Sequence, residues 1–170
     1  MKRQFLMVVW AVLWGAGFTG AALAGDTGGM IMFAERVVDE VPEGKRCEIS
    51  IKTNDVPIEY NFRGAGSRCS NDEYSWFRLD NAPSAVVFSL RSDAWSSSNE
   101  HLGCKPLSMS RWVFELRTIR ERTNTKWYRI SELEEKDNGA LLDSGGLRLE
   151  KNDFQYGRID GKLSCVIINH

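Results

Sequence analysis

The strongest constraint on the fold is an alternation of apolar and polar residues with a period of two. This pattern is typical of half-buried β-strands, whose successive side chains point to opposite faces of a sheet. It recurs in residues 47–51, 58–62, 112–117 and 147–149. Two more apolar runs, 85–90 and 165–168, are typical of fully buried strands. Turn-forming clusters separate the segments, so we predict an all-β, compact antiparallel sandwich.

Residues 111–122 leave a second interpretation open, because their apolar positions also fit the stripe of an amphipathic helix. We favour a strand there, since Trp, Val, Phe and Ile are enriched in strands. Residues 130–135 are predicted to form a single helical turn.

The N-terminus has the layout of a cleavable secretory signal. Lys2 and Arg3 precede an apolar stretch over residues 5–18, and Ala22 and Ala24 place small residues before the expected cleavage point. A membrane anchor is the alternative, because residues 5–24 carry no charge and are long enough to span a bilayer. Glycines within the stretch favour cleavage. We therefore predict a signal peptide over 1–24, a single domain over 25–170, and a periplasmic or secreted location.

The charge balance argues against a nucleic-acid-binding protein. The chain has 22 basic and 23 acidic residues, and loss of Lys2 and Arg3 with the signal shifts the balance further toward acid. A nucleic-acid binder is expected to carry a basic surplus. The same balance gives no reason to expect binding to an anionic membrane after cleavage.

All four cysteines lie after the predicted signal, at Cys47, Cys69, Cys104 and Cys165. Four cysteines in an exported chain predict two disulfides with three possible connectivities. We expect Cys47–Cys165, which would join an early strand to the last one, and Cys69–Cys104, which would brace the middle of the chain. Their spacing contains no Cys-x-x-Cys pair, which disfavours zinc and redox sites.

Two stretches, 60–83 and 149–169, carry a resemblance to a known family. Their motifs are Cys69-Ser70-Asn71-Asp72, Phe77-Arg78-Leu79, Asn81-Ala82-Pro83 and Ile159-Asp160-Gly161-Lys162-Leu163-Ser164. Together they resemble the secreted single-domain βγ-crystallin-like proteins. The resemblance implies a disulfide-braced, crystallin-like β-sandwich.

The resemblance also implies a calcium site. In the family signature, two acidic or amide residues are followed after two positions by a hydroxyl pair. Asn71, Asp72 and Ser75 match one copy, and Asp93 belongs to a second near-match. Trp76 and Ser92 depart from the pattern, so we expect at most a weak Ca²⁺ site and otherwise no cofactor. In the alternative interpretation Asn71 and Asp72 are turn residues, and Trp76 and Leu79 reach the core.

Partner binding is expected in the loop that follows. Trp95 is surrounded by small polar residues, which is typical of an exposed contact residue. The predicted contact residues are Trp95, Ser96, Ser97, Asn99 and His101. The alternative is a loop that folds over the edge of the sheet. The other tryptophans of the mature chain, Trp76, Trp112 and Trp127, are expected in the core.

The sequence holds no recognisable catalytic motif, and we expect the protein not to be an enzyme. The favoured hypothesis is an exported binding protein, an inhibitor or immunity protein that neutralises a periplasmic or secreted enzyme or toxin. The second is a calcium-binding, crystallin-like structural or stress protein. The third is a small secreted hydrolase, for which Ser97, Glu100 and His101 offer the required residue types.

Overall fold

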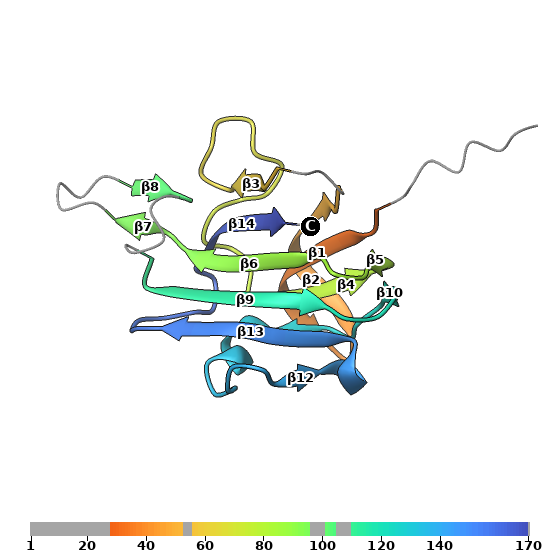
Figure 1. Cartoon of the computed structure of the whole chain (residues 1–170). Helices are drawn as coiled ribbons and strands as arrows, with labels where there is room; N and C mark the ends of the chain where they lie inside the picture. Colours follow the sequence, from red (N-terminus) through yellow and green to blue (C-terminus); the bar gives the residue numbers. More distant parts are fainter. Residues whose placement is uncertain (1–27, 53–55, 96–100, 105–109, 170) are drawn as a thin grey trace, which may run out of the picture.

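The computed structural model describes residues 28–52, 56–95, 101–104 and 110–169, which form two packed antiparallel sheets. The first sheet has the order β11 (Tyr128–Arg129), β4 (Trp76–Asp80), β1 (Met30–Val38), β2 (Val41–Ser50). The second has the order β12 (Leu141–Leu142), β13 (Leu147–Phe154), β9 (Trp112–Thr118), β6 (Val87–Ser92), β14 (Leu163–Asn169), β3 (Ile58–Asn61). Figure 1 shows the second sheet from β3 at the top to β12 at the bottom. The predicted all-β antiparallel sandwich is confirmed.

Smaller elements complete the sandwich. Two short ribbons pair β5 (Ala82–Pro83) with β10 (Arg122–Thr123) and β7 (Ala94–Trp95) with β8 (His101–Gly103). Two 3₁₀ turns are η2 (Ile130–Leu133) and η3 (Asp143–Gly145). The predicted helical turn over 130–135 is therefore present as η2. The predicted strand within 111–122 is β9, and the helical alternative there is wrong.

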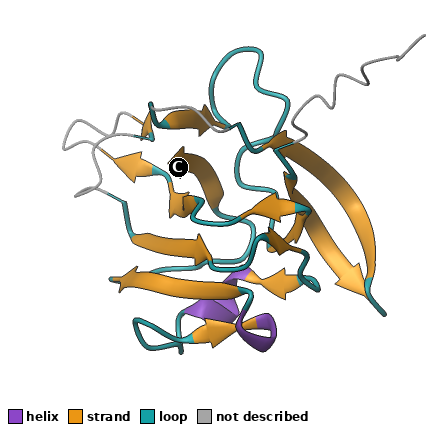
Figure 2. Ribbon diagram, turned by 45° about the vertical axis from the view of Figure 1, so that its right-hand side comes forward, coloured by secondary structure: helices purple, strands orange, loops and turns teal. Residues whose placement is uncertain are grey.

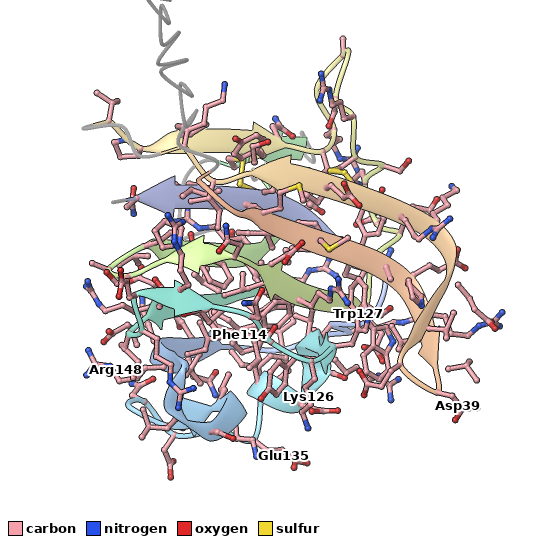
Figure 3. All side chains as sticks on the ribbon, turned by 90° about the vertical axis from the view of Figure 1, so that its right-hand side faces the viewer. Asp39, Phe114, Lys126, Trp127, Glu135 and Arg148 are labelled. Carbon is pink, nitrogen blue, oxygen red and sulfur yellow. A yellow bond between two sulfur atoms is a disulfide. The ribbon has the colours of Figure 1, made fainter. Side chains whose placement is uncertain are left out.

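The core lies between the two sheets and follows the alternation of the sequence. Phe33 and Phe77 point inward from the first sheet, and Phe88 and Phe114 point inward from the second. Phe77 and Phe88 meet edge to face across the core, with ring centroids 6.1 Å apart. Figure 3 shows Phe114 inside the sandwich. These fully buried aromatic side chains supply much of the apolar area that stabilises the fold.

The disulfides differ from the expected pairing. The structure joins Cys47 to Cys69 and Cys104 to Cys165. Cys47 lies in β2 and packs with Cys69 in the main core between the sheets. Cys165 lies in β14, directly opposite Arg91 of β6. Its side chain lies on the same face as that of Ile167, which is the outer side of the second sheet. The expected bonds Cys47–Cys165 and Cys69–Cys104 are both wrong, because in each pair one cysteine lies in the core between the sheets and the other on the outer side of the second sheet.

A second cluster of buried residues covers part of that outer face. It consists of Cys104, Cys165 and Ile167, and the neighbouring Ser89 and Arg91 are buried as well. Burial lowers the pKa of the Arg91 guanidinium, and the charges of Glu115 and Glu59 oppose this shift. The Cys104–Cys165 bond thus fixes the segment after β8 to the outside of the sandwich.

The two disulfides indicate an oxidising compartment, as expected for an exported chain. Within the described residues, no helix has the length and apolar character needed to cross a membrane. The predicted signal peptide lies outside the described residues.

Candidate functional site

The structure brings together two of the four residues of the predicted calcium site. Asp72 and Asp93 line one small cavity of about 70 Å³, together with Arg111, Arg158 and Lys162. Asp72 accepts a hydrogen bond from the Ser164 hydroxyl at 3.1 Å, and its other carboxylate oxygen lies 3.5 Å from the Lys162 ammonium. The Asp93 carboxylate lies 3.1 Å from the Arg63 guanidinium.

Asn71 and Ser75 do not join this cavity. The Ser75 backbone connects strand β1 to the 3₁₀ turn η2, because its amide donates to the Ala34 carbonyl and its carbonyl accepts from the Ile130 amide. Asn71 keeps one buried amide oxygen that has no hydrogen-bond partner in the described structure. That oxygen is a single ligand, whereas calcium takes six to eight.

The residues around the cavity do not fit a calcium ion. Both carboxylates already lie beside cationic side chains, and the cavity wall adds further positive charge. No group of three or more His, Cys, Asp or Glu side chains suited to a metal ion occurs among the described residues. The weak Ca²⁺ site therefore stays a prediction of the resemblance.

Trp76 is half-buried and does not reach the core, which corrects the expectation. Phe77 and Leu79 take the inward positions of β4, and Trp76 lies three residues before Leu79. An odd spacing in a strand places two side chains on opposite faces. Leu79, Trp112 and Trp127 are buried as predicted.

Little of the predicted partner-binding loop falls within the described structure. The backbones of Trp95 and His101 pair across β7 and β8, and their side chains are outside the description. Ser96, Ser97 and Asn99 lie outside the described residues altogether. The proposed contact role of this loop therefore stays a prediction.

Among the described residues, a projecting hairpin is the most exposed apolar element of the sandwich's first sheet. The far part of the β1–β2 hairpin, residues 35–45, is called the arm below. Each of its residues is exposed or half-buried, whereas Phe33 and Ala34 just before it are fully buried. Figure 2 shows the hairpin at the right, with its far end leaning away from the other strands, and Figure 3 places Asp39 at its tip.

A β-bulge marks the point where the arm leaves the sandwich. The pairing of β1 with β2 shifts register between Ala34 and Arg36. Opposite the shift, Gly44 has a φ of +72°, and a Cβ there would lie 2.4 Å from a carboxylate oxygen of Glu35. That carboxylate accepts a hydrogen bond from the Lys45 amide at 3.1 Å. Bulges bend a strand and increase its twist, so this one sets the direction of the arm.

Side-chain contacts hold the arm in shape. Arg36 and Glu43 form an ion pair across the two strands at 2.7 Å. Lys45 reaches the Glu73 carboxylate at 2.5 Å, which ties the base of the arm to the sandwich. This hydrogen bond raises the pKa of Lys45. The arm is therefore held in a defined conformation by contacts within the chain.

The tip of the arm is apolar on both of its faces. Val38 pairs with Val41 and Val37 pairs with Pro42, and successive pairs of a hairpin project to opposite sides. Val38 and Val41 are 45% and 59% exposed, while Val37 and Pro42 are half-buried. Beyond them, Asp39 and Glu40 form the two-residue turn.

Two larger clefts open on the surface of the described residues. One, of about 550 Å³, lies at the base of the arm and is lined by charged residues including Glu35, Arg36 and Arg129. The Arg129 guanidinium binds the Asp160 carboxylate there. The other, of about 440 Å³, lies between the edges of β2 and β3. In it the Tyr60 hydroxyl donates to the Ser50 carbonyl, and burial raises the pKa of Tyr60.

No family model, no curated protein and no solved structure matches this chain. The crystallin-like resemblance of residues 60–83 and 149–169 therefore stays a prediction.

Sequence reasoning missed the arm. A two-residue hairpin turn usually carries Asn-Gly or Asp-Gly, and here the turn is Asp39-Glu40. The available signal was the palindromic arrangement of apolar residues around two acids, Val37-Val38-Asp39-Glu40-Val41-Pro42.

Proposed function

We propose that this chain is an exported protein-binding domain, an inhibitor or immunity protein, that inserts its arm into a cleft of a periplasmic or secreted enzyme or toxin. The main observation behind the proposal is the apolar tip of the arm. Exposed Val38 and Val41 lie on one face of the tip, and Val37 and Pro42 lie on the opposite face. The signal peptide over 1–24 and its cleavage belong to the same proposal.

Because the tip is apolar on both faces, it fits a cleft in the partner better than a flat partner surface. A flat partner would cover only one of the two valine-bearing faces and leave the other in water. Burial of apolar surface stabilises a complex by about 25 cal/mol per Å², so the largest gain comes when both faces are enclosed. Enzymes commonly place their active sites in concave clefts of this kind.

The rigidity of the arm supports the same function. Ordering a flexible loop on binding costs affinity, and elements that already hold the bound conformation avoid that cost. The bulge at Gly44, the Arg36–Glu43 ion pair and the Lys45–Glu73 ion pair hold the arm in place. Exposed apolar residues on a braced, projecting hairpin favour a partner more than a structural role.

Photo-crosslinking tests the proposal. A photoreactive amino acid replaces Val41 in one variant and Leu141 in another, each expressed as the full chain in the source organism. Leu141 is 63% exposed and lies in β12, at the edge of the second sheet, so it is a matched apolar control. We expect Val41 to capture one extracytoplasmic protein that Leu141 does not capture.

A competition experiment then links the capture to the valines. Unlabelled protein is expected to abolish the Val41 crosslink and to inhibit the captured protein. The double variant Val38→Ser, Val41→Ser is expected to compete at least ten times more weakly, a loss of about 1.4 kcal/mol. Equal capture through Leu141, or full competition by the double variant, contradicts the proposal.

A further inference from the structure

The small cavity at one end of the second sheet is lined by more cationic than anionic side chains. It has a volume of about 70 Å³ and lies between the end of β6, the residue before β9 and the connection from β13 to β14. A single water molecule needs about 10–15 Å³ of such space, so the cavity has room for a small ion. Its wall contains three cations, Arg111, Arg158 and Lys162, and two carboxylates, Asp72 and Asp93.

Both carboxylates already have cationic neighbours. Asp93 lies 3.1 Å from the Arg63 guanidinium. Asp72 lies 3.5 Å from the Lys162 ammonium and accepts a hydrogen bond from the Ser164 hydroxyl. With Arg63 included, the described side chains at the cavity are four cations and two carboxylates, which leaves a surplus of positive charge. Neighbouring like charges repel one another, and a bound anion offsets that repulsion.

Arg158 is the cation that a ligand can engage without breaking an existing contact. No hydrogen bond or ion pair in the described structure involves its guanidinium, while its backbone carbonyl accepts from the Trp112 indole at 3.3 Å. The side chain is exposed and lines both this cavity and the cleft of about 550 Å³ at the base of the arm. The backbone of Arg158 is thus anchored, and its guanidinium offers five N–H donors.

Ser92 adds a buried hydroxyl to the cavity wall. Ser92 is 4% exposed, and its oxygen accepts hydrogen bonds from the Arg111 and Trp112 amides at 2.8 and 3.3 Å. Among the described residues, the acceptor for its own hydrogen is the Asp93 carbonyl at 3.5 Å. Hydroxyl hydrogen bonds are normally about 2.5–3.0 Å long, so this buried donor lacks a good acceptor. An oxyanion in the cavity supplies one.

We infer that this cavity binds a phosphate or sulfate group. Such a group has several acceptor oxygens, to which arginine donates through a planar fork and lysine through a compact ammonium. Arg158 and Lys162 are its charged partners, and Ser92 is its hydroxyl donor. The site goes beyond the proposed function and does not depend on the arm.

The group is either a free ion or an ester on a larger molecule. The cleft of about 550 Å³ shares Asp72, Arg158 and Lys162 with the cavity. A molecule that carries the phosphate or sulfate therefore has a place to lie beside it.

Titration of the purified protein with inorganic phosphate tests the inference. Thermal unfolding is followed in phosphate and in chloride at equal ionic strength, so that charge screening is the same in both. At ten times the dissociation constant measured by calorimetry, phosphate is expected to raise the melting temperature by about 3–6 °C over the chloride value. Sulfate is expected to act in the same way.

Arg158→Gln is the decisive variant, because the lost guanidinium has no partner in the described fold. We expect at least tenfold weaker phosphate binding, with the melting temperature in chloride unchanged. Arg46→Gln is the matched control, since Arg46 is an exposed arginine of β2 that lines neither the cavity nor the larger cleft. It removes the same charge, and its phosphate affinity is expected to stay within twofold of the wild type.

A hexose phosphate and a hexose sulfate, titrated beside the free ions and the unmodified hexose, identify the source of the group. Tighter binding of the ester than of the free ion assigns a group carried on a larger molecule. Equal or weaker binding of the ester assigns the free ion.

The inference is overturned if phosphate stabilises the wild type no more than chloride does. Equal phosphate affinity of Arg158→Gln and the wild type also overturns it. Equal losses in Arg158→Gln and Arg46→Gln have the same consequence, because they report the net charge of the protein rather than a site at the cavity.

Discussion

The carboxylate of Glu35 fills the space that a side chain on residue 44 would need, since a Cβ on Gly44 would lie 2.4 Å from its Oε2 atom. Gly44→Ala is therefore expected to strain the bulge through the positive φ of residue 44 and to displace the flexible Glu35 carboxylate from its hydrogen bond with the Lys45 amide. We expect a loss of about 1–2 kcal/mol in the free energy of unfolding, measured by chemical denaturation.

Gly66→Ala is the control, because Gly66 has a φ of +82° and no atom within 4 Å of the place that a Cβ would take. It carries the conformational cost alone, about 1 kcal/mol. Equal losses of stability in the two variants would show that the Glu35 side chain adds nothing to the cost of Gly44→Ala.

Glu150 joins two arginines that face each other across neighbouring strands. Arg117 pairs directly with Arg148, and one Glu150 carboxylate oxygen accepts hydrogen bonds from both. The bond from Arg148 lowers the pKa of Glu150 most, with a second contribution from Arg117. A carboxylate with a lowered folded-state pKa stabilises the protein above its unfolded pKa, and this stability is lost as the pH falls through the folded pKa.

Glu150→Gln is accordingly expected to lower stability by about 0.5–1 kcal/mol at neutral pH, where the two like charges lose their bridge. The difference from the wild type is expected to shrink below about pH 4 and to vanish as Glu150 is protonated. Denaturant titrations at several pH values measure it. A difference that stays constant with pH would contradict the assignment.

The two disulfides are expected to contribute unequally. Cys47–Cys69 spans 22 residues and Cys104–Cys165 spans 61. Loop-closure entropy in the unfolded chain predicts about 3 kcal/mol for the first and about 4 kcal/mol for the second. Paired substitutions to alanine, compared by denaturant unfolding, check the order, and peptide mapping under non-reducing conditions checks the pairing.

Thr118 holds the turn before β6 through its buried hydroxyl. The hydroxyl accepts from the Val86 amide at 3.0 Å and donates to the Pro83 carbonyl at 2.6 Å. Thr118→Val keeps the shape but leaves these groups unpaired, so we expect a loss of about 1–3 kcal/mol. Thr118→Ser keeps the hydroxyl and serves as the control. A larger loss in the serine variant would show that the methyl group matters more than the hydrogen bonds.

Calcium is expected to leave the protein unchanged, because Lys162 and Arg63 already compensate Asp72 and Asp93. Titration calorimetry with Ca²⁺ should give no heat of binding, and the melting temperature should not depend on added Ca²⁺ or chelator. Asp72→Asn is expected to lower stability equally in both conditions. Binding that disappears in Asp72→Asn would restore the calcium hypothesis.

The sequence predicts strands correctly where one face of the strand lies in the core and the other lies in solvent, because such strands alternate apolar and polar residues. Residues 112–117 are an example, because Trp112, Phe114 and Leu116 all point inward in β9. The same pattern does not predict strand β1. Its first residues, Met30-Ile31-Met32-Phe33, are apolar throughout, since Met30 and Met32 are half-buried on the outer face. Alternation is lost when both faces of a strand are partly covered.

The disulfide pairing and the projecting arm could not be predicted from local sequence patterns. Cys47 lies in a mostly polar strand and Cys165 in an apolar one, and only the assembled sandwich shows that they lie on different sides of the second sheet. The arm forms where β1 and β2 extend beyond the rest of the first sheet. This depends on the relative lengths of the strands in the folded structure. Asp72 and Asp93 do meet at one cavity, but the cations around it come from distant segments.

The Cys47–Cys69 bond lies immediately behind the arm, because Cys47 follows Arg46 in β2 and Cys69 belongs to the chain that leads into β4. If a bound partner pulled on the tip, the hydrogen bonds between β1 and β2 would open one after another from the tip inward. Unzipping would stop at Cys47, where a covalent link holds β2 to the rest of the molecule. The disulfide between two core residues therefore limits how far the hairpin can open from its tip.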